Sequence, residues 1–299
     1  MVTYLVEKGA QVNIQNKSGD TPLHYAAEHQ SLEVVTYLVE KGAQVNIQTK
    51  SGDTPLHYAA KLIIFPEKHR SLEVVTYLVE QGAQVNIQNE SGDTPLHSAA
   101  KHQSLEVVTY LVEKGAQVNI QNESGDTPLH YAAQHTGYWK LVTYLVEKGA
   151  QVNIQNKSGD TPLHYAAKHK SLEVVTYLVE KGAQVNIQNK SGDTPLHHAA
   201  VLCSMRILNY MVENGAVVDC ENNKKCTPLI LACACTKTDN VICLLEKGAD
   251  PNLGNITAMH AAAASHSTDV LQVLLDIGSD VNILTESGNS PLHMQCDGV

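Results

Sequence analysis

The stretch SGDTPLH at Ser18–His24 occurs six times in this sequence. The other five copies occupy residues 51–57, 91–97, 124–130, 158–164 and 191–197. Related strings begin at Thr227, Thr257 and Ser290, and most intervals between successive copies are 33 residues. A string that recurs at a fixed period indicates one small structural unit stacked many times, rather than a single compact domain.

The pattern within one repeat predicts two short helices, as residues 16–48 illustrate. Thr21 is a good N-cap and is followed by proline, which suits the first position of a helix. A second helix should begin after Ser31 and stop at Gly42, a residue that adopts the left-handed conformation easily. Apolar residues recur at helical spacing in both segments. Because neither helix can bury its apolar side alone, stacked neighbours must supply the core.

Composition and charge exclude several classes of protein. The formal net charge of −10 would repel a phosphate backbone, so we expect no nucleic-acid partner. No apolar run approaches the roughly 18 residues of a membrane span, and the first residues lack the layout of a secretory signal. All seven cysteines lie in the last third of the chain, and their odd number favours a reducing compartment. We expect a cytoplasmic protein, with the nucleus as the alternative.

The period of 33 residues and the TPLH-x-A string closely resemble ankyrin repeats. This resemblance implies an all-α solenoid of helix-turn-helix units joined by extended turns, and a single array over residues 1–299. About eight complete repeats are expected, at residues 16–48, 49–88, 89–121, 122–155, 156–188, 189–221, 222–254 and 255–284. Those within 16–221 are nearly identical, and those within 222–284 diverge. Partial units flank them at 1–15 and 285–299.

The repeats depart from the common pattern at four places. Seven extra residues lie around KLIIFPEKHR at 61–70, and one extra residue lies in HTGYWK at 135–140. Lys225 stands where the other turns have glycine, and the connection at 253–256 is three residues short. The chain starts within a second helix and stops within a first helix. We therefore expect a fragment or a truncated gene product.

SGDTPLH also contains a serine, an aspartate and a histidine, the side chains of a hydrolase. In a catalytic triad these groups converge on one point. Here Thr21 directs the chain into a helix that contains His24, and six identical active sites in a row would be unusual. The resemblance implies that this histidine and threonine join each turn to its neighbour by hydrogen bonds. We expect both residues to be structural and the protein not to be an enzyme.

The histidines and cysteines do not form the pattern of a metal site. Stacked histidines would be spaced by roughly 8–10 Å, the distance between packed helices. Zinc needs several ligand atoms about 2 Å from one ion. The cysteines lack a C-x₂-C pair; Cys233, Cys243 and Cys296 replace core residues of other repeats. Glycines occur singly, so no loop is suited to a phosphate group. We expect no metal, no cofactor and no small-molecule substrate.

Surface residues are the candidates for partner recognition, because the resemblance implies that turns and first helices line a concave groove for protein partners. The turns contribute Lys17, Asp20, Lys50, Glu90, Glu123, Lys157 and Lys190. The first helices contribute Tyr25, Tyr58, Tyr131, Tyr165 and His198. Apolar candidates in the insertions and the later repeats are Leu62, Ile63, Ile64, Phe65, Trp139, Val201 and Leu202. Two alternatives stay open: the uniform repeats record only recent duplication, and the insertion at 61–70 is a tolerated loop.

The implied function is protein binding, by an interaction module, scaffold or adaptor. The alternative is a targeting array from a larger multidomain protein, such as a channel, a kinase or a ubiquitin-ligase subunit, or an exported bacterial effector. The resemblance also implies a modification, since ankyrin substrates of the asparaginyl hydroxylase carry leucine eight residues before the asparagine and an acid two before it. Asn282 matches this pattern fully, and Asn252 matches it apart from Pro251.

Overall fold

The computed structural model describes residues 1–61, 70–135, 137, 139–202 and 205–296. These residues form 18 helices and no strand, which confirms the all-α prediction. The chain divides into two compact units. The N-terminal unit comprises residues 1–132 and 138–151, and the C-terminal unit comprises residues 133–137 and 152–299. A single array over the whole chain stays a prediction.

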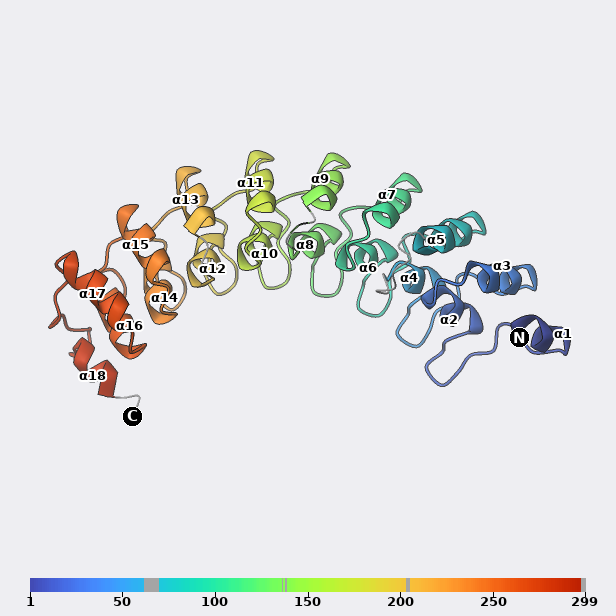
Figure 1. Cartoon of the computed structure of the whole chain (residues 1–299), viewed down its shortest axis with the longest axis horizontal. Helices are drawn as coiled ribbons and strands as arrows, with labels where there is room; N and C mark the ends of the chain where they lie inside the picture. The colour runs from blue at the N-terminus through green and yellow to red at the C-terminus, as the bar shows by residue number, and fades with distance from the viewer. Residues whose placement is uncertain (62–69, 136, 138, 203–204, 297–299) are drawn as a thin grey trace. The chain divides into compact units, whose positions relative to one another are not determined.

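The N-terminal unit alternates short first helices with longer second helices (Figure 1). Its helices are α1 (Val2–Glu7), α2 (Pro22–Glu28), α3 (Leu32–Glu40), α4 (Pro55–Ala59), α5 (Arg70–Glu80), α6 (Pro95–Lys101), α7 (Leu105–Glu113), α8 (Pro128–Ala133, whose last residue belongs to the other unit) and α9 (Trp139–Glu147). First helices pack on first helices, as α2 does on α4, and second helices pack on second helices, as α3 does on α5.

The C-terminal unit repeats the same arrangement (Figure 1). Its helices are α10 (Pro162–Lys168), α11 (Leu172–Glu180), α12 (Pro195–Val201), α13 (Met205–Glu213), α14 (Pro228–Ala234), α15 (Thr238–Glu246), α16 (Ala258–Ala264), α17 (Thr268–Asp276) and α18 (Pro291–Cys296). The first helices α10, α12, α14, α16 and α18 lie side by side, and α11, α13, α15 and α17 form a second row.

The core of each unit lies between these two rows of helices. In the repeat at 16–48, Leu23 and Leu38 are each 1% exposed, while Ala27 and Val35 are fully buried. Burying one such leucine contributes about 1.5–3 kcal/mol relative to leaving it in water. The small alanines allow adjacent first helices to approach closely. The apolar spacing that the sequence shows is therefore the spacing of the core.

The TPLH string forms a capping arrangement at the start of the first helix. The backbone N–H of Thr21 donates to Nδ1 of His24 at 3.1 Å, and the threonine hydroxyl lies 2.9 Å from the same nitrogen. A backbone N–H can only donate, so Nδ1 is an acceptor and the imidazole carries its proton on Nε2. That Nε2–H donates to the carbonyl oxygen of Asp53, in the next repeat, at 3.2 Å. The histidine is structural, as the sequence suggests.

Burial opposes protonation of these histidines. It lowers the pKa of His24, His57, His97 and His197 below the ordinary value, and that of His164 to about 4, although the carbonyl contacts partly oppose the shift. A proton on Nδ1 would also replace an acceptor by a donor facing the N–H of the threonine. The neutral imidazole is the form that the fold accommodates.

The turn glycines are required by close approach between repeats. Gly19 has a φ of +87°, which L side chains rarely adopt, and a Cβ there would lie 2.7 Å from the backbone nitrogen of Lys50 in the next repeat. Gly42 has a φ of +89° and ends α3, as expected for a left-handed stop. The turn glycine therefore sets how closely two repeats stack.

Lowering the pH from 7 to 5 should destabilise the fold. The unfolded chain binds protons on histidine below about pH 6.5, whereas folded His164 binds one only near pH 4. The stabilisation is therefore complete above pH 6.5 and is lost as the pH falls towards 4. Each such histidine adds a slope of about 1.4 kcal/mol per pH unit within its window. Urea unfolding followed by circular dichroism at several pH values measures this slope.

The matched variant is His164→Asn, which cannot titrate in this range. It should lower stability at pH 7, because the contact with the next repeat is lost, and it should reduce the slope between pH 7 and 5. Equal stability of the parent chain at pH 7 and pH 5 would contradict the proposed burial of neutral histidines.

Candidate interaction surface

The inner face is defined here as the turn tips and the solvent side of the first helices within each compact unit. Tyr25 is 49% exposed on this face, and Tyr58 and Tyr131 are half-buried. The rings of Tyr58 and Tyr131 pack edge-on against His24 and His97 of the preceding repeats, with centroids 5.4 Å and 6.0 Å apart. The predicted row of tyrosines thus lies on one face, and its rings partly cover the histidine layer.

Tyrosine hydroxyls also contact the acidic turn of a neighbouring repeat. The hydroxyl of Tyr58 donates to Oδ1 of Asp20 at 2.8 Å. Burial and this carboxylate raise the pKa of Tyr58 well above its usual value, and burial raises the pKa of Tyr131 to about 12. These phenols stay protonated and act as hydrogen-bond donors. Asp20, a predicted binding residue, is therefore partly engaged within the fold.

A second contact between turns was not anticipated from the sequence. The side-chain amide of Asn89 donates to Oδ1 of Asp53 in the preceding repeat at 2.7 Å. The same pair recurs as Asn122 with Asp93 at 2.7 Å, Asn189 with Asp160 at 2.8 Å and Asn222 with Asp193 at 2.7 Å. The signal in the sequence is the Asn-x₃-Asp spacing at the start of most repeats. These aspartates stabilise the stack as well as facing the surface.

The charged residues at the turn tips are exposed, as predicted. Their backbones pair with the preceding turn: the N–H of Lys50 donates to Ser18 O at 2.9 Å, and that of Glu90 donates to Ser51 O at 2.8 Å. The side chains of Lys17, Lys50, Glu90 and Glu123 therefore project from a fixed backbone in the N-terminal unit. In the C-terminal unit the exposed tips are Lys157 and Lys190.

In the C-terminal unit the row of tyrosines continues with Tyr165, and His198 replaces tyrosine in the next repeat. Its Nε2 lies 4.0 Å from Oδ1 of Asp160, and its ring packs edge-on against His164, with centroids 5.7 Å apart. Burial lowers the pKa of His198, against the pull of Asp160. Val201 and Leu202, at the end of the same helix, are half-buried. Val201 and Leu202 stand where the repeat at 156–188 has Lys168 and His169, so the inner face is less polar here than in that repeat.

The two insertions are described to different extents. Leu62, Ile63, Ile64 and Phe65 lie outside the described residues. Lys61, just before them, places its Nζ 3.6 Å from Oδ2 of Asp53 and 4.3 Å from the centre of the Tyr58 ring. Trp139 begins α9 and is 44% exposed, and its carbonyl accepts from the hydroxyl of Thr143 at 2.9 Å. Trp139 is therefore a large apolar group at the surface.

The two asparagines predicted as modification sites are exposed. The backbone N–H of Asn252 donates to Oδ1 of Asp250 at 2.9 Å, and that of Asn282 donates to Oδ1 of Asp280 at 2.8 Å. In the nearly identical repeats the equivalent asparagine joins two repeats instead. Asn46, for example, donates to Gly82 O at 3.0 Å and accepts from another backbone N–H.

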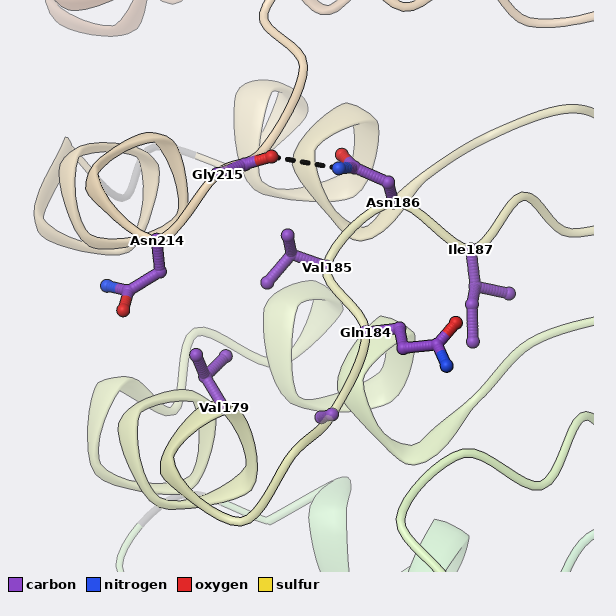
Figure 2. A pocket seen from close by; sticks show the side chains of 8 residues that line it. Val179, Gln184, Val185, Asn186, Ile187, Asn214 and Gly215 are labelled. Carbon is purple, nitrogen blue, oxygen red and sulfur yellow. Dashed lines mark hydrogen bonds between the residues drawn. The ribbon is translucent and has the colours of Figure 1, made fainter.

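A shallow cavity of about 650 Å³ lies away from the inner face, between two successive turns of the C-terminal unit (Figure 2). It is lined by Val179, Ala183, Gln184, Val185, Asn186, Ile187, Asn214 and Gly215. Nδ2 of Asn186 donates across it to Gly215 O at 2.8 Å. The lining includes no acid, base or thiol. The cavity is therefore a gap between turns, without groups suited to catalysis.

No group of three histidine, cysteine or acidic side chains suited to a metal occurs among the described residues. Cys233 and Cys243 are buried, as expected for core residues, and burial raises the pKa of the Cys233 thiol to about 12. The side chain of Cys296 lies outside the described set. Within the part of the chain that the structure describes, no helix is long and apolar enough to cross a membrane.

Replacing Tyr58 by phenylalanine should destabilise the fold by about 1 kcal/mol, because the half-buried Asp20 carboxylate loses a hydrogen bond. Tyr25→Phe is the matched control, since its hydroxyl is an acceptor for the exposed amide of Asn16 at 3.1 Å. The control should change stability by less than about 0.5 kcal/mol. Urea unfolding of both variants measures the difference. Equal effects would show that the contact with Asp20 contributes nothing specific.

Comparison with known proteins agrees with this architecture. The family model for ankyrin repeats in three copies matches overlapping stretches, at residues 1–89, 62–156, 119–189, 137–222, 183–255 and 202–285. An ankyrin repeat-containing protein of Schizosaccharomyces pombe is 36% identical over 61 residues, which are 19% of this chain and 30% of that protein. The crystal structure of the human ASB11 ankyrin repeat domain is similar with a TM-score of 0.68 and 28% identity, covering 78% of this chain and 100% of that domain. Since the family model spans nearly all of the stacked helix pairs, this chain belongs to the ankyrin repeat family.

Proposed function

We propose that this chain is a non-enzymatic adaptor that binds a protein partner through its inner face. Ankyrin repeats are a generic protein–protein interaction module, and the helices of this chain are arranged as such repeats. The observation that carries the proposal is that the TPLH histidine, the side chain best suited to catalysis, is engaged in hydrogen bonds within the fold. Both ring nitrogens of His24 are occupied by contacts within the fold, and the ring is fully buried. Its surroundings leave it no role in general acid–base chemistry.

We propose that recognition depends on the positions where the repeats differ. A partner that contacts only identical repeats meets the same side chains at every step, so nothing fixes its register. Trp139, His198, Val201 and Leu202 break this uniformity, as does the segment Leu62–Phe65. Trp139 is 44% exposed, and an aromatic side chain is a common anchor of interface energy. The turn-tip charges would then orient the partner by electrostatic complementarity.

A role as the targeting array of a larger protein is the second form of this proposal. It is supported by the solved relative, which is a domain of human ASB11. Both the adaptor and the targeting array would bind a partner through the inner face. They differ in whether the array acts alone or brings the rest of a larger protein to that partner. Sequencing transcripts through the codons for residues 1 and 299 separates them, because further coding sequence with other domains would favour the targeting array.

The first experiment identifies a partner by affinity capture with the whole chain as bait and mass spectrometry. Binding of the purified partner is then measured for Trp139→Ala and for Val201→Lys with Leu202→Lys. Losing an anchor should weaken binding at least tenfold, or about 1.4 kcal/mol. Lys181→Ala is the matched control, since Lys181 lies over Tyr177 on a second helix, away from the inner face.

Deletion of Lys61–Glu67 tests the insertion separately, because it restores the repeat at 49–88 to the common length. If binding falls while thermal stability holds, the insertion is a contact element. If stability rises and the affinity is unchanged, the insertion is a tolerated loop. Unchanged affinity in all three variants would exclude these positions as the partner site.

We also propose Asn282, and secondarily Asn252, as sites of hydroxylation in an animal host. Both side chains are exposed, whereas Asn46, which bridges two repeats, is half-buried. Co-expression with an asparaginyl hydroxylase should add one oxygen to the peptide that contains Asn282. Peptide mass spectrometry measures the addition, with Asn282→Ala as the control. An unmodified Asn282 in fully soluble protein would exclude the site.

A further inference from the structure

Intact junctions between repeats of the C-terminal unit are joined by several hydrogen bonds. Between the repeats at 156–188 and 189–221, His164 Nε2 donates to Asp193 O at 3.1 Å. Asn189 donates to Asp160 at 2.8 Å, and the N–H of Lys190 donates to Ser158 O at 2.8 Å. These bonds connect one turn directly to the next. They fix the relative orientation of adjacent repeats more closely than apolar packing does, because hydrogen bonds are directional.

The following junction, between the repeats at 189–221 and 222–254, keeps the same kinds of hydrogen bond. His197 Nε2 donates to Cys226 O at 3.2 Å, and Asn222 donates to Asp193 at 2.7 Å. The N–H of Asn223 donates to Ser191 O at 3.0 Å. Divergence of the sequence at 222 therefore leaves this junction intact.

The junction between the repeats at 222–254 and 255–284 lacks these hydrogen bonds. Ile230 replaces the histidine, Cys226 replaces the aspartate, and the connection at 253–256 is too short to form the usual turn. Within the described residues, two hydrogen bonds cross this boundary. The hydroxyl of Ser265 donates to Cys233 O at 3.1 Å, and the N–H of Ala258 donates to Pro251 O at 3.1 Å inside the connection itself.

An apolar contact within the repeat at 222–254 occupies the place of the missing histidine. Ile230 is 2% exposed, and its Cδ1 would lie 2.7 Å from a Cβ built on Gly254. Gly254 has a φ of +105°, and the same Cβ would lie 2.7 Å from Lys225 O. The isoleucine thus fills the space that the shortened connection leaves. Apolar packing of this kind buries surface but does not fix the relative orientation of adjacent repeats.

Beyond the boundary the hydrogen bond from histidine returns. His260 Nε2 donates to Asn289 O at 3.0 Å, so residues 255–296 are joined to one another by the usual contact. The first helix here, AMHAAAA in α16, is rich in alanine and offers α14 small side chains to pack against. The segment is therefore internally connected, and it is joined to α14 and α15 mainly by apolar packing rather than by hydrogen bonds between turns.

We propose that the connection at 253–256 is a conformational boundary, at which residues 255–296 open from α14 and α15 as one unit while residues 156–252 stay folded. In a repeat protein, stability is roughly the sum of repeat terms and nearest-neighbour interface terms. A weak interface therefore separates cooperative units. Opening uncovers Leu229, Ile230 and Leu244, which are buried in the closed state. This inference does not depend on the proposed partner site.

Native-state hydrogen exchange on the whole chain tests the boundary. The protection factors of amides in α16 and α17 should be similar to each other and at least tenfold lower than those in α14 and α15. The step between the two sets is the decisive result. Ordinary fraying of a chain end would instead give a gradual fall from α14 to α17, and such a gradient, or equal protection throughout, would overturn the proposal.

A restored junction provides the second measurement. In this variant Leu253–Ile256 is replaced by the common turn IQNKSGD, together with Ile230→His and Cys226→Asp. Protection of α16 and α17 should rise at least tenfold, to the level of α14 and α15. Ile230→His alone is the matched control, because it restores neither the turn nor the Asn–Asp pair, and it should raise protection by less than the full set of changes does.

The converse variant keeps the test decisive if the restored junction does not fold. His197→Ile weakens the intact junction at 189–221 and 222–254, and the chain already accommodates isoleucine after a threonine cap at Thr227, whose Oγ1 accepts from the N–H of Ile230 at 3.3 Å. Protection of α14 and α15 should fall at least tenfold while that of α10 and α11 is unchanged. A uniform fall over all helices would contradict independent units.

Discussion

The buried imidazole of each TPLH string is the interaction on which the rest of the structure depends. In the first full repeat, Nδ1 of His24 accepts from the N–H of Thr21 and fixes the start of its own helix, while Nε2 donates to Asp53 O and fixes the next turn. One neutral side chain thus satisfies polar groups in two repeats that no water reaches. An unpaired buried polar group costs about 1–3 kcal/mol. A different spacing between repeats would break these hydrogen bonds and would therefore be unfavourable at every copy of the string. The period of 33 residues in the sequence reflects this requirement for a fixed spacing between repeats.

Because the histidine and the turn glycine set the stacking, other positions are available for a different use. The same position of a first helix carries Tyr25, the buried Ser98 or His198, and the histidine beneath it still donates to the next repeat in each case. The tyrosines nevertheless contribute to the stack, since the Tyr58 hydroxyl reaches Asp20 of the preceding repeat. The inner face is therefore a structural layer as well as the proposed recognition surface. A substitution there must be measured for stability before its effect on binding can be interpreted.

The sequence was sufficient to predict the helices, their caps and the structural role of TPLH, because these depend on residues three or four positions apart. Thr21 and Gly42 are clear local signals of a helix start and a helix stop. The contacts of Asn89 with Asp53 and of Tyr58 with Asp20 could not be predicted in the same way. Each joins residues 36 or 38 positions apart, and it exists only when two turns are stacked in one register. The turn tips and Trp139 are exposed, whereas the partner site itself depends on a second molecule that the sequence does not contain.

Departures from the common repeat have two different consequences, according to the layer in which they occur. His198 lies on the inner face, and the junction beneath it keeps its hydrogen bonds through His197. Ile230 lies in the histidine layer, and there the bonds that join adjacent turns are lost, because the histidine, the aspartate and three residues of the turn are absent. A surface change alters what the array can bind, while a change in the histidine layer alters how far an opening can propagate. Both kinds occur within residues 189–254, so the part of the chain with the most distinctive surface also adjoins its weakest junction. A partner that contacts α12 and α14 would rest on helices of which α14 packs against α16 across the junction at 253–256. Its binding would therefore be coupled to whether that junction is closed.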